Sequence, residues 1–248
     1  MRNPNLLPAR VMGLAAFFLS WEAASRWVGD YWVPGIGQVS QRLVADLLSG
    51  DLLLDLAMTS QLLLAGTAIG TLAGCGLACL LRLSSRLDAM LQPLITALMS
   101  IPKLGLVPLL VLWFGTGWAP KVMLVALTVL FIVFSLTYSG LVTIDSRLTM
   151  TAKVFGATQY QITRDIVIPS VLPFVFTGLQ VALPWAVSAA LVAEYLSAKV
   201  GVGHSIEEAR QLSDTVGVYS GIVLATLLVL ICNAALQGAR ALTIRTQP

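Results

Sequence analysis

The sequence predicts an all-α polytopic membrane protein, and two observations carry that prediction. Of its 248 residues, 57% are hydrophobic and only 11% are charged, whereas soluble domains carry about 25% charged residues. Runs without a charged residue recur along the chain, and several exceed the roughly 20 residues that a helix needs to cross a bilayer. The chain has more apolar surface than a soluble core of this size could bury, so we expect lipid to surround it.

We expect six transmembrane helices in a single domain that takes up residues 1–248. The first span contains Glu22 and Arg26, and the third is broken by several prolines and by Lys103. The apolar run after Arg10 is also compatible with a secretory signal. A retained span is favoured, because removing it would leave an odd number of spans and invert every later loop. The expected spans are residues 11–28, 53–81, 88–114, 121–142, 169–197 and 216–239.

The distribution of lysine and arginine predicts the orientation of these spans. Loops with an excess of positive charge stay in the cytoplasm, and this rule places both termini on the cytoplasmic side. The residues assigned to that side are Arg2, Arg10, Arg82, Arg86, Arg147, Lys153, Arg164, Arg240 and Arg245. The opposite side mixes Arg42, Lys121, Lys199 and Arg210 with Asp30, Asp46, Asp51, Glu207, Glu208 and Asp214.

Two spans contain residues that shape a helix. Gly66, Gly70 and Gly74 recur every four residues in the second span. Such spacing allows close helix packing, either within the chain or against a second copy. Pro184 lies in the middle of the fifth span and should kink it, as a packing feature or as a hinge.

A polar loop of residues 145–168 separates the fourth and fifth spans. Thr158 and Gln161 form a capping-box pattern, which marks the start of a helix. We expect a short helix that runs toward Arg164 and lies crosswise under the membrane. Pro169 would end that helix or begin the next span at its first position.

The same loop offers a surface to a partner. Gly156 lacks a side chain, so another molecule can approach its backbone closely. Ala152, Phe155, Gln159 and Ile162 recur around it at helical spacing and would form an apolar knob for a groove. An interfacial helix without a partner fits the residues of the loop equally well.

The loop resembles the cytoplasmic EAA loop of bacterial ABC-importer permeases, whose pattern is Glu-Ala-Ala, three residues, Gly, nine residues and Ile-x-Leu-Pro. Four residues of this chain match the pattern, namely Ala152, Gly156, Ile166 and Pro169. Met150 and Thr151 stand where the pattern has Glu and Ala. The chain looks like the sulfonate, taurine and nitrate permease branch over nearly its whole length, through residues 100–117, 172–183 and 192–206.

This resemblance implies a type I importer permease fold with a cytoplasmic coupling helix, in a bacterial inner membrane. The implied partners are a second copy of this or a related permease, two ATP-binding subunits that carry ATP and Mg²⁺, and an external binding protein. The implied solute is a small anion of the sulfonate, taurine or nitrate type, and this chain itself would bind no cofactor. The implied docking positions are Met150, Thr151, Ala152, Phe155, Gly156, Ala157, Thr158, Ile166 and Pro169.

Lys103 is the deepest cation in the predicted spans. If Asp88 begins the third span, Lys103 lies at most about 22 Å deeper at the rise of an α-helix. An intramembrane lysine needs water, a partner or a ligand. It either lines the translocation path or is satisfied by backbone carbonyls that the nearby prolines release. The candidate path residues are Ser100, Pro102, Lys103, Pro108, Pro184 and Ser188.

Glu194 lies near the outer end of the fifth span. It is a candidate outer gate or a contact for the binding protein, and a plain interfacial carboxylate is the simpler interpretation. The sequence Gly201-x-Gly203 suggests a surface turn, with His204 as a solvated residue within it.

The sequence offers no enzyme motif of its own. It lacks GxxxxGK[ST], HExxH and GxSxG, so we expect no catalytic residues, no metal site and no nucleic-acid contact. An ATP-independent carrier or channel is the main alternative to an ATP-driven importer. Carriers tend to show two related halves and charges at the membrane midplane, and Lys103 is the one deep charge here.

Overall fold

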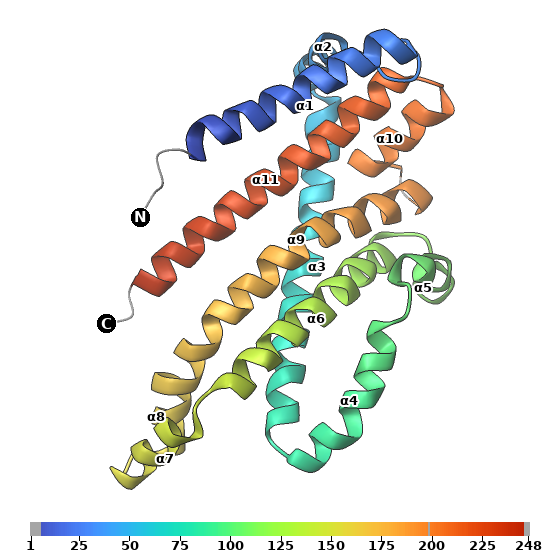
Figure 1. The fold of residues 1–248 in the computed structure, drawn as a ribbon. Helices are drawn as coiled ribbons and strands as arrows, with labels where there is room; N and C mark the ends of the chain where they lie inside the picture. Colours follow the sequence, from blue (N-terminus) through green and yellow to red (C-terminus); the bar gives the residue numbers. More distant parts are fainter. Residues whose placement is uncertain (1–5, 198, 246–248) are drawn as a thin grey trace.

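The computed structural model describes residues 6–197 and 199–245, and all regular elements in that part of the chain are helical (Figure 1). The prediction of an all-α protein is confirmed. The long helices are α1 (Leu6–Val28), α3 (Asp51–Arg82), α6 (Trp118–Thr143), α9 (Ile168–Ser197) and α11 (Thr215–Arg245). The shorter elements are α2 (Ile36–Ser49), α4 (Ser85–Met99), η1 (Lys103–Leu106), α5 (Val107–Phe114), α7 (Ser146–Val154), α8 (Gln159–Ile162), η2 (Thr163–Val167) and α10 (Val202–Gln211).

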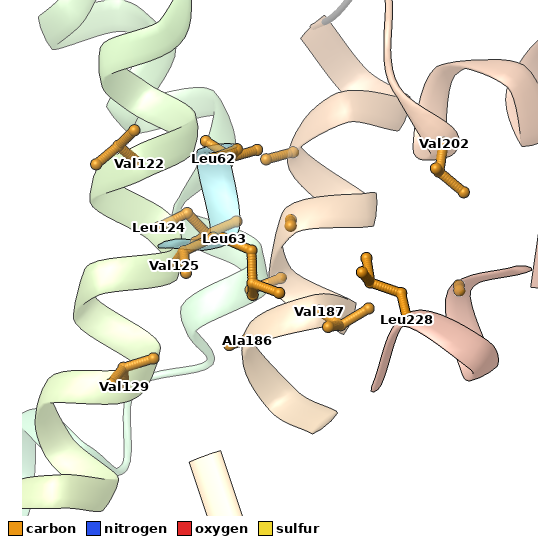
Figure 2. Packing of buried hydrophobic residues seen from close by; sticks show 14 of the residues in the cluster. Leu62, Leu63, Val122, Leu124, Val125, Val129, Ala186, Val187, Val202 and Leu228 are labelled. Carbon is orange, nitrogen blue, oxygen red and sulfur yellow. The ribbon is translucent and has the colours of Figure 1, made fainter. Parts of the chain in front are cut away.

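The core of the fold is the contact of α3, α6 and α9. Figure 2 shows Leu62 and Leu63 of α3 facing the valines of α6. The side of α9 that meets them is made of small residues, which lets the helices approach closely. Its most buried alanines are Ala182, Ala186, Ala189, Ala190 and Ala193.

The glycine series in α3 packs within the chain. A Cβ atom at Gly70 would lie 2.5 Å from the carbonyl oxygen of Ala126 in α6, and one at Gly74 would lie 2.6 Å from that of Leu130. Real side chains do not come so close to a backbone. The sequence allowed this glycine series to pack within the chain or against a second copy, and packing within the chain is confirmed.

Membrane-spanning helices are identified by their length and apolar character. Among the described residues, four single helices meet this criterion, namely α3, α6, the continuous α8–η2–α9 and α11. The bent pair formed by α4 and η1–α5 makes five if it counts as one span, with a bend of 83° between its parts. Residues 11–28 form a helix within α1, which is outside this set, so the six-span topology stays a prediction. The two chain termini, which we predict to be cytoplasmic, are residues 1–5 and 246–248. They lie outside the described residues.

The break predicted in the third span is present. Helix α4 ends at Met99 with Ser100 as its C-cap, and Pro102 in extended conformation precedes the short 3₁₀ turn η1. Proline cannot donate the backbone hydrogen bond that would continue the helix. The backbone then turns by 83° into α5, which lies beside α6 (Figure 1).

The bundle has two ends that differ in structure. The loop end carries α7, α8 and the turn between α3 and α4, and the α10 end carries α2, α10 and the turn before α6 (Figure 1). Helix α9 runs from the loop end to the α10 end, so it links the two ends structurally.

Candidate functional site

Local sequence determines helix α7 at both of its ends. The carboxylate of Asp145 accepts the backbone N–H of Arg147 at 2.8 Å and so caps the first turn. At the other end, the N–H of Gly156 bonds the carbonyl of Lys153, and the N–H of Ala157 bonds that of Ala152, both at 3.0 Å. Gly156 has a φ of 83°. This is the Schellman arrangement that glycine favours after a helix.

The capping box at Thr158 is confirmed, but the helix that it starts is not the predicted one. Thr158 and Gln161 exchange backbone and side-chain hydrogen bonds at 2.8 and 3.3 Å. The helix then continues through α8 and the π-helical η2 into α9 without a break. Pro169 lies just after the π-helical turn, where a widened backbone accommodates its missing N–H and its ring. The short separate helix of this loop is α7, which precedes Gly156.

The predicted apolar knob is wrong in its membership. Ile162 is only 3% exposed and points into the protein, because it lies on α8, beyond the turn at Gly156. Gln159 lies on that helix as well. The exposed apolar side chains of the loop belong mostly to α7 and its end.

We call these exposed side chains the α7 patch: Leu148, Met150, Val154, Phe155 and Tyr160. Phe155 is 85% exposed and Val154 is 81% exposed. A Cβ atom at Gly156 would meet nothing within 4 Å, so the space beside its backbone is open. The other positions implied for docking lie around the patch, with Thr151 and Thr158 exposed and Ala152, Ala157, Ile166 and Pro169 half-buried.

A cavity of about 420 Å³ lies between the bent span, α6 and α9. Lys103 lines it, and its ammonium group donates to the carbonyl of Met99 at 2.9 Å and lies 5.3 Å from the centre of the Phe131 ring. The bond to the Met99 carbonyl agrees with the interpretation that the lysine is satisfied locally, and its role in a translocation path stays a prediction. We call this space the path cavity, and its lining residues are Ile101, Pro102, Lys103, Leu104, Thr128, Ile132, Val181, Trp185 and Ser188.

The path cavity brings together only some of the predicted path residues. Pro102 and Lys103 reach it from the break in the third span, and Ser188 reaches it from α9. Ser100, Pro108 and Pro184 are not among its lining residues. The role of all six predicted residues in a translocation path stays a prediction.

Glu194 is a buried residue, not a plain interfacial carboxylate. It is 2% exposed. Its carboxylate accepts the hydroxyl of Thr59 at 2.8 Å and the backbone N–H of Gly203 at 2.9 Å. Thr59 in turn accepts the N–H of Val202 at 3.0 Å. One carboxylate thus connects α3, α9 and the start of α10.

A second carboxylate acts beside it. Asp55 accepts the N–H of Gly201 at 2.7 Å and also the hydroxyl of Ser205. Carboxylates are favourable at a helix N-terminus, where the amides lack partners within the helix. We call this arrangement the α10 clamp: Asp55, Thr59 and Glu194 with the amides of Gly201, Val202 and Gly203.

The glycines of the clamp have a specific reason to be glycine. A Cβ atom at Gly201 would lie 2.5 Å from the carboxyl carbon of Glu194, and one at Gly203 would lie 2.4 Å from the carbonyl oxygen of Leu191. The prediction of a surface turn is wrong, because both glycines are buried. His204 is half-buried in the first turn of α10.

Sequence reasoning missed Asp55 and Thr59. They lie one helical turn apart at the start of an apolar run, and a polar pair in that place is the signal that could have found them.

Charged residues hold the rest of the α10 end together. Arg42 of α2 forms ion pairs with Asp46 and with Asp214, each at 2.8 Å. The Arg210 guanidinium bonds Glu207 and holds the pKa of that carboxyl at about 2. Helix α2, which sequence reasoning treated as an outer loop, is thereby fixed to the start of α11.

Comparison with known proteins decides the family. The family described as "Binding-protein-dependent transport system inner membrane component" matches residues 66–245. The chain belongs to this family. It is therefore an ABC importer permease subunit, as its EAA-like loop suggested. Membership of this family also confirms the membrane protein that the composition predicted.

Relatives and solved structures agree with this family. The permease is 31% identical to an aliphatic sulfonates transport permease protein of Escherichia coli, over 99% of this chain and 92% of that one. It is also 31% identical to the formylaminopyrimidine transport permease protein of Halalkalibacterium halodurans, over 88% and 87% of the two chains. A chain of the inward-facing MetNI methionine ABC transporter has the same fold, with a TM-score of 0.67 at 16% identity, over 82% of this chain and 99% of that chain.

Proposed function

We propose that this permease forms the transmembrane path of an ATP-driven importer, together with a second copy of itself or of a related permease. Two ATP-binding subunits would dock at the loop end, and an external binding protein would deliver the solute at the α10 end. The observation that carries this proposal is the α7 patch. Apolar side chains as exposed as Val154 and Phe155, outside the spans, are suited to a partner's groove.

The continuity of α8, η2 and α9 supplies the coupling. Closure of the ATP-binding subunits would displace α7, and this displacement would pass directly into α9. That helix carries Trp185 and Ser188 at the path cavity and Glu194 at the clamp. Movement at the loop end would therefore reach both the path and the outer end of the permease.

The orientation that we propose places the loop end in the cytoplasm of a bacterium, with both termini on that side of the inner membrane. The positive-inside rule supports it, because Arg147, Lys153 and Arg164 surround the α7 patch. The α10 end instead mixes basic residues with carboxylates.

The proposed solute is a small anion of the sulfonate, taurine or nitrate type. The relative named for aliphatic sulfonates supports this class. So does Lys103, which places a cation at the wall of the path cavity, where a positive charge can compensate an anion in a medium of low dielectric constant.

The test is purification of the permease from its native membrane, followed by identification of the bound subunits. We expect two ATP-binding subunits per permease pair and uptake that stops without ATP. An ATP-independent carrier or channel would instead purify without such subunits and transport solute down its gradient. Uptake that continues without ATP would overturn the proposal.

A further inference from the structure

A polar cavity of about 330 Å³ lies at the α10 end, where α2 and the first turns of α3 meet α10 and the start of α11. We call it the acidic pocket. Four carboxylates and one guanidinium line it, which gives it a formal charge of −3. These charged residues are Asp46, Asp55, Glu208, Asp214 and Arg42. The acidic pocket shares no lining residue with the path cavity, so its occupant is not a solute held in that cavity.

Arg42 does not neutralise the acidic pocket. Its guanidinium forms ion pairs with Asp46 and Asp214, each at 2.8 Å. The carboxylate of Asp55 accepts an amide and a hydroxyl, which do not cancel its charge. Glu208 is exposed at the wall and forms no ion pair within the described part of the chain. Negative charge therefore remains available to a cation that enters.

Ser220 gives an independent sign that the acidic pocket takes a ligand. It is only 3% exposed, and its hydroxyl has no hydrogen-bond partner among the described residues. The little surface that it exposes includes the hydroxyl oxygen, at the wall of the pocket. Ser49 at the same pocket instead donates to the carbonyl of Asp46 at 2.9 Å. A buried hydroxyl without a partner lowers stability, and a ligand with an N–H group would supply the missing bond.

The remaining walls of the acidic pocket are partly apolar, with Leu52 from α3 and Ala209 and Leu212 from α10. A long basic side chain fits such a mixture, because its methylene stem packs on apolar surface while its charged end stays among polar groups. A metal ion fits it less well. Within residues 6–197 and 199–245, no group of three or more His, Cys, Asp or Glu side chains is placed to hold one.

We propose that the acidic pocket binds one arginine or lysine side chain of the external binding protein. The cationic end would contact Glu208, Asp55 and the hydroxyl of Ser220, and the stem would lie along Leu52 and Leu212. Charge and location together select this partner, since a protein that arrives from outside presents side chains to the α10 end. This inference rests on the proposed function, and it adds the contact by which the binding protein docks.

The contact would also reach the rest of the permease. Asp55 belongs both to the acidic pocket and to the α10 clamp, in which it accepts the N–H of Gly201 at 2.7 Å. Glu194 of α9 bonds the same turn through Gly203. A cation that draws on the charge of Asp55 would therefore act on the turn that connects α9 to α10.

The test measures equilibrium binding of the importer's own binding protein to the complex with its ATP-binding subunits in lipid nanodiscs. Ser49→Trp fills the acidic pocket from its exposed rim, so binding should weaken at least about tenfold, as when an anchoring side chain loses its pocket. Ser40→Trp is the matched control and should bind normally. Ser40 is exposed on the same helix and also donates to the carbonyl three residues before it, but it does not line the pocket.

A second pair of variants tests the charge. Glu208→Gln removes one negative charge from the acidic pocket, and Ser40→Lys makes the same change in net charge outside it. We expect about threefold weaker binding and a smaller salt dependence for Glu208→Gln alone. General attraction between the two proteins would instead give equal effects.

A charge swap identifies the source of the cation. Glu208→Arg should weaken binding at least about tenfold, because like charges then meet in the pocket. Each surface arginine and lysine of the binding protein is then replaced by glutamate in turn. We expect one of these replacements to restore binding to Glu208→Arg and not to Ser49→Trp.

The inference is overturned if Ser49→Trp binds as tightly as Ser40→Trp, if Glu208→Gln and Ser40→Lys have equal effects, or if no replacement restores binding. It is also overturned if butylguanidinium, a small cation with an aliphatic stem, occupies the pocket without displacing the binding protein. These results leave the importer function standing when the complex keeps its ATP-binding subunits and its uptake needs ATP. A permease that never purifies with such subunits would instead contradict the proposed function.

Discussion

The two ends of this permease differ in how the short helix that each carries is held. At the α10 end, the first amides of α10 are bonded by side chains of α3 and α9, and Glu194 is 2% exposed. At the loop end, α7 is capped by its own residues, while Phe155 stays 85% exposed. The start of α10 is bonded by other helices of the chain, whereas α7 is held by local bonds alone and exposes the α7 patch.

This difference predicts how each end responds to substitution. Changes at the α10 clamp should lower the free energy of unfolding, because they leave buried groups without partners or create overlaps. Changes in the α7 patch should leave folding intact and affect only assembly.

The largest effect is expected from Gly203→Val. Its added carbon atoms would overlap the carbonyl oxygen of Leu191, so we expect a loss of about 3 kcal/mol in the free energy of unfolding. The measurement is the apparent melting temperature in nanodiscs, followed by tryptophan fluorescence. Gly37→Val is the control at the same end, since a Cβ atom there meets nothing within 4 Å. Equal melting temperatures of the two variants would contradict the geometry of the clamp.

Thr59→Val should have the next largest effect. The change keeps the shape of the side chain but removes a donor to Glu194 and the acceptor of the Val202 amide. We expect a loss of about 1–3 kcal/mol. In Thr226→Val only a bond to the carbonyl of Ile222 in the same helix is lost. If both valine variants melt at the same temperature, the clamp does not stabilise the α10 end.

Gly156→Ala should cost less, about 1 kcal/mol, because a residue with a Cβ atom is strained at positive φ. Asparagine tolerates this region better, so Gly156→Asn should melt closer to the native protein. Co-purification then measures how many ATP-binding subunits Gly156→Asn loses relative to the native protein. Because this variant folds, such a loss reports on the close approach of the partner to this backbone and not on folding. Full retention in both variants would show that the partner does not approach this backbone.

The smallest effect on folding is expected from Phe155→Asp and Leu212→Asp, exposed by 85% and 73% at opposite ends. Both should stay within about 0.5 kcal/mol of the native protein. Only Phe155→Asp should release the ATP-binding subunits in co-purification. Release by both variants, or by neither, would remove the distinction between the two ends.

The sequence predicted most of the long helices but only part of the candidate functional site. Apolar runs, the prolines near Lys103 and the capping box at Thr158 are local signals. Helices α3, α6, α9 and α11, the break after α4 and the start of α8 lie where these signals predict them, and the six-span count stays a prediction. The membership of the α7 patch depends on the turn at Gly156, which separates Ile162 from Phe155. A periodicity that ignores such a turn assigns both residues to one face.

The α10 clamp could not be read from local sequence for a different reason. Asp55, Glu194 and Gly201 come together only when α3 and α9 pack against the start of α10. Glu194 by itself resembles any carboxylate near the end of a span. Its burial follows from long-range packing, which a single sequence does not display.

The most direct test of docking at the loop end is site-specific photo-crosslinking in native membranes. A photoreactive phenylalanine analogue replaces Phe155 in one variant and Leu212 in the other, and the crosslinked proteins are identified by mass spectrometry. We predict that the probe at Phe155 captures the ATP-binding subunit of the importer and that the probe at Leu212 does not. Capture of that subunit from Leu212, or capture of only lipid or a second permease from Phe155, would contradict docking at the α7 patch.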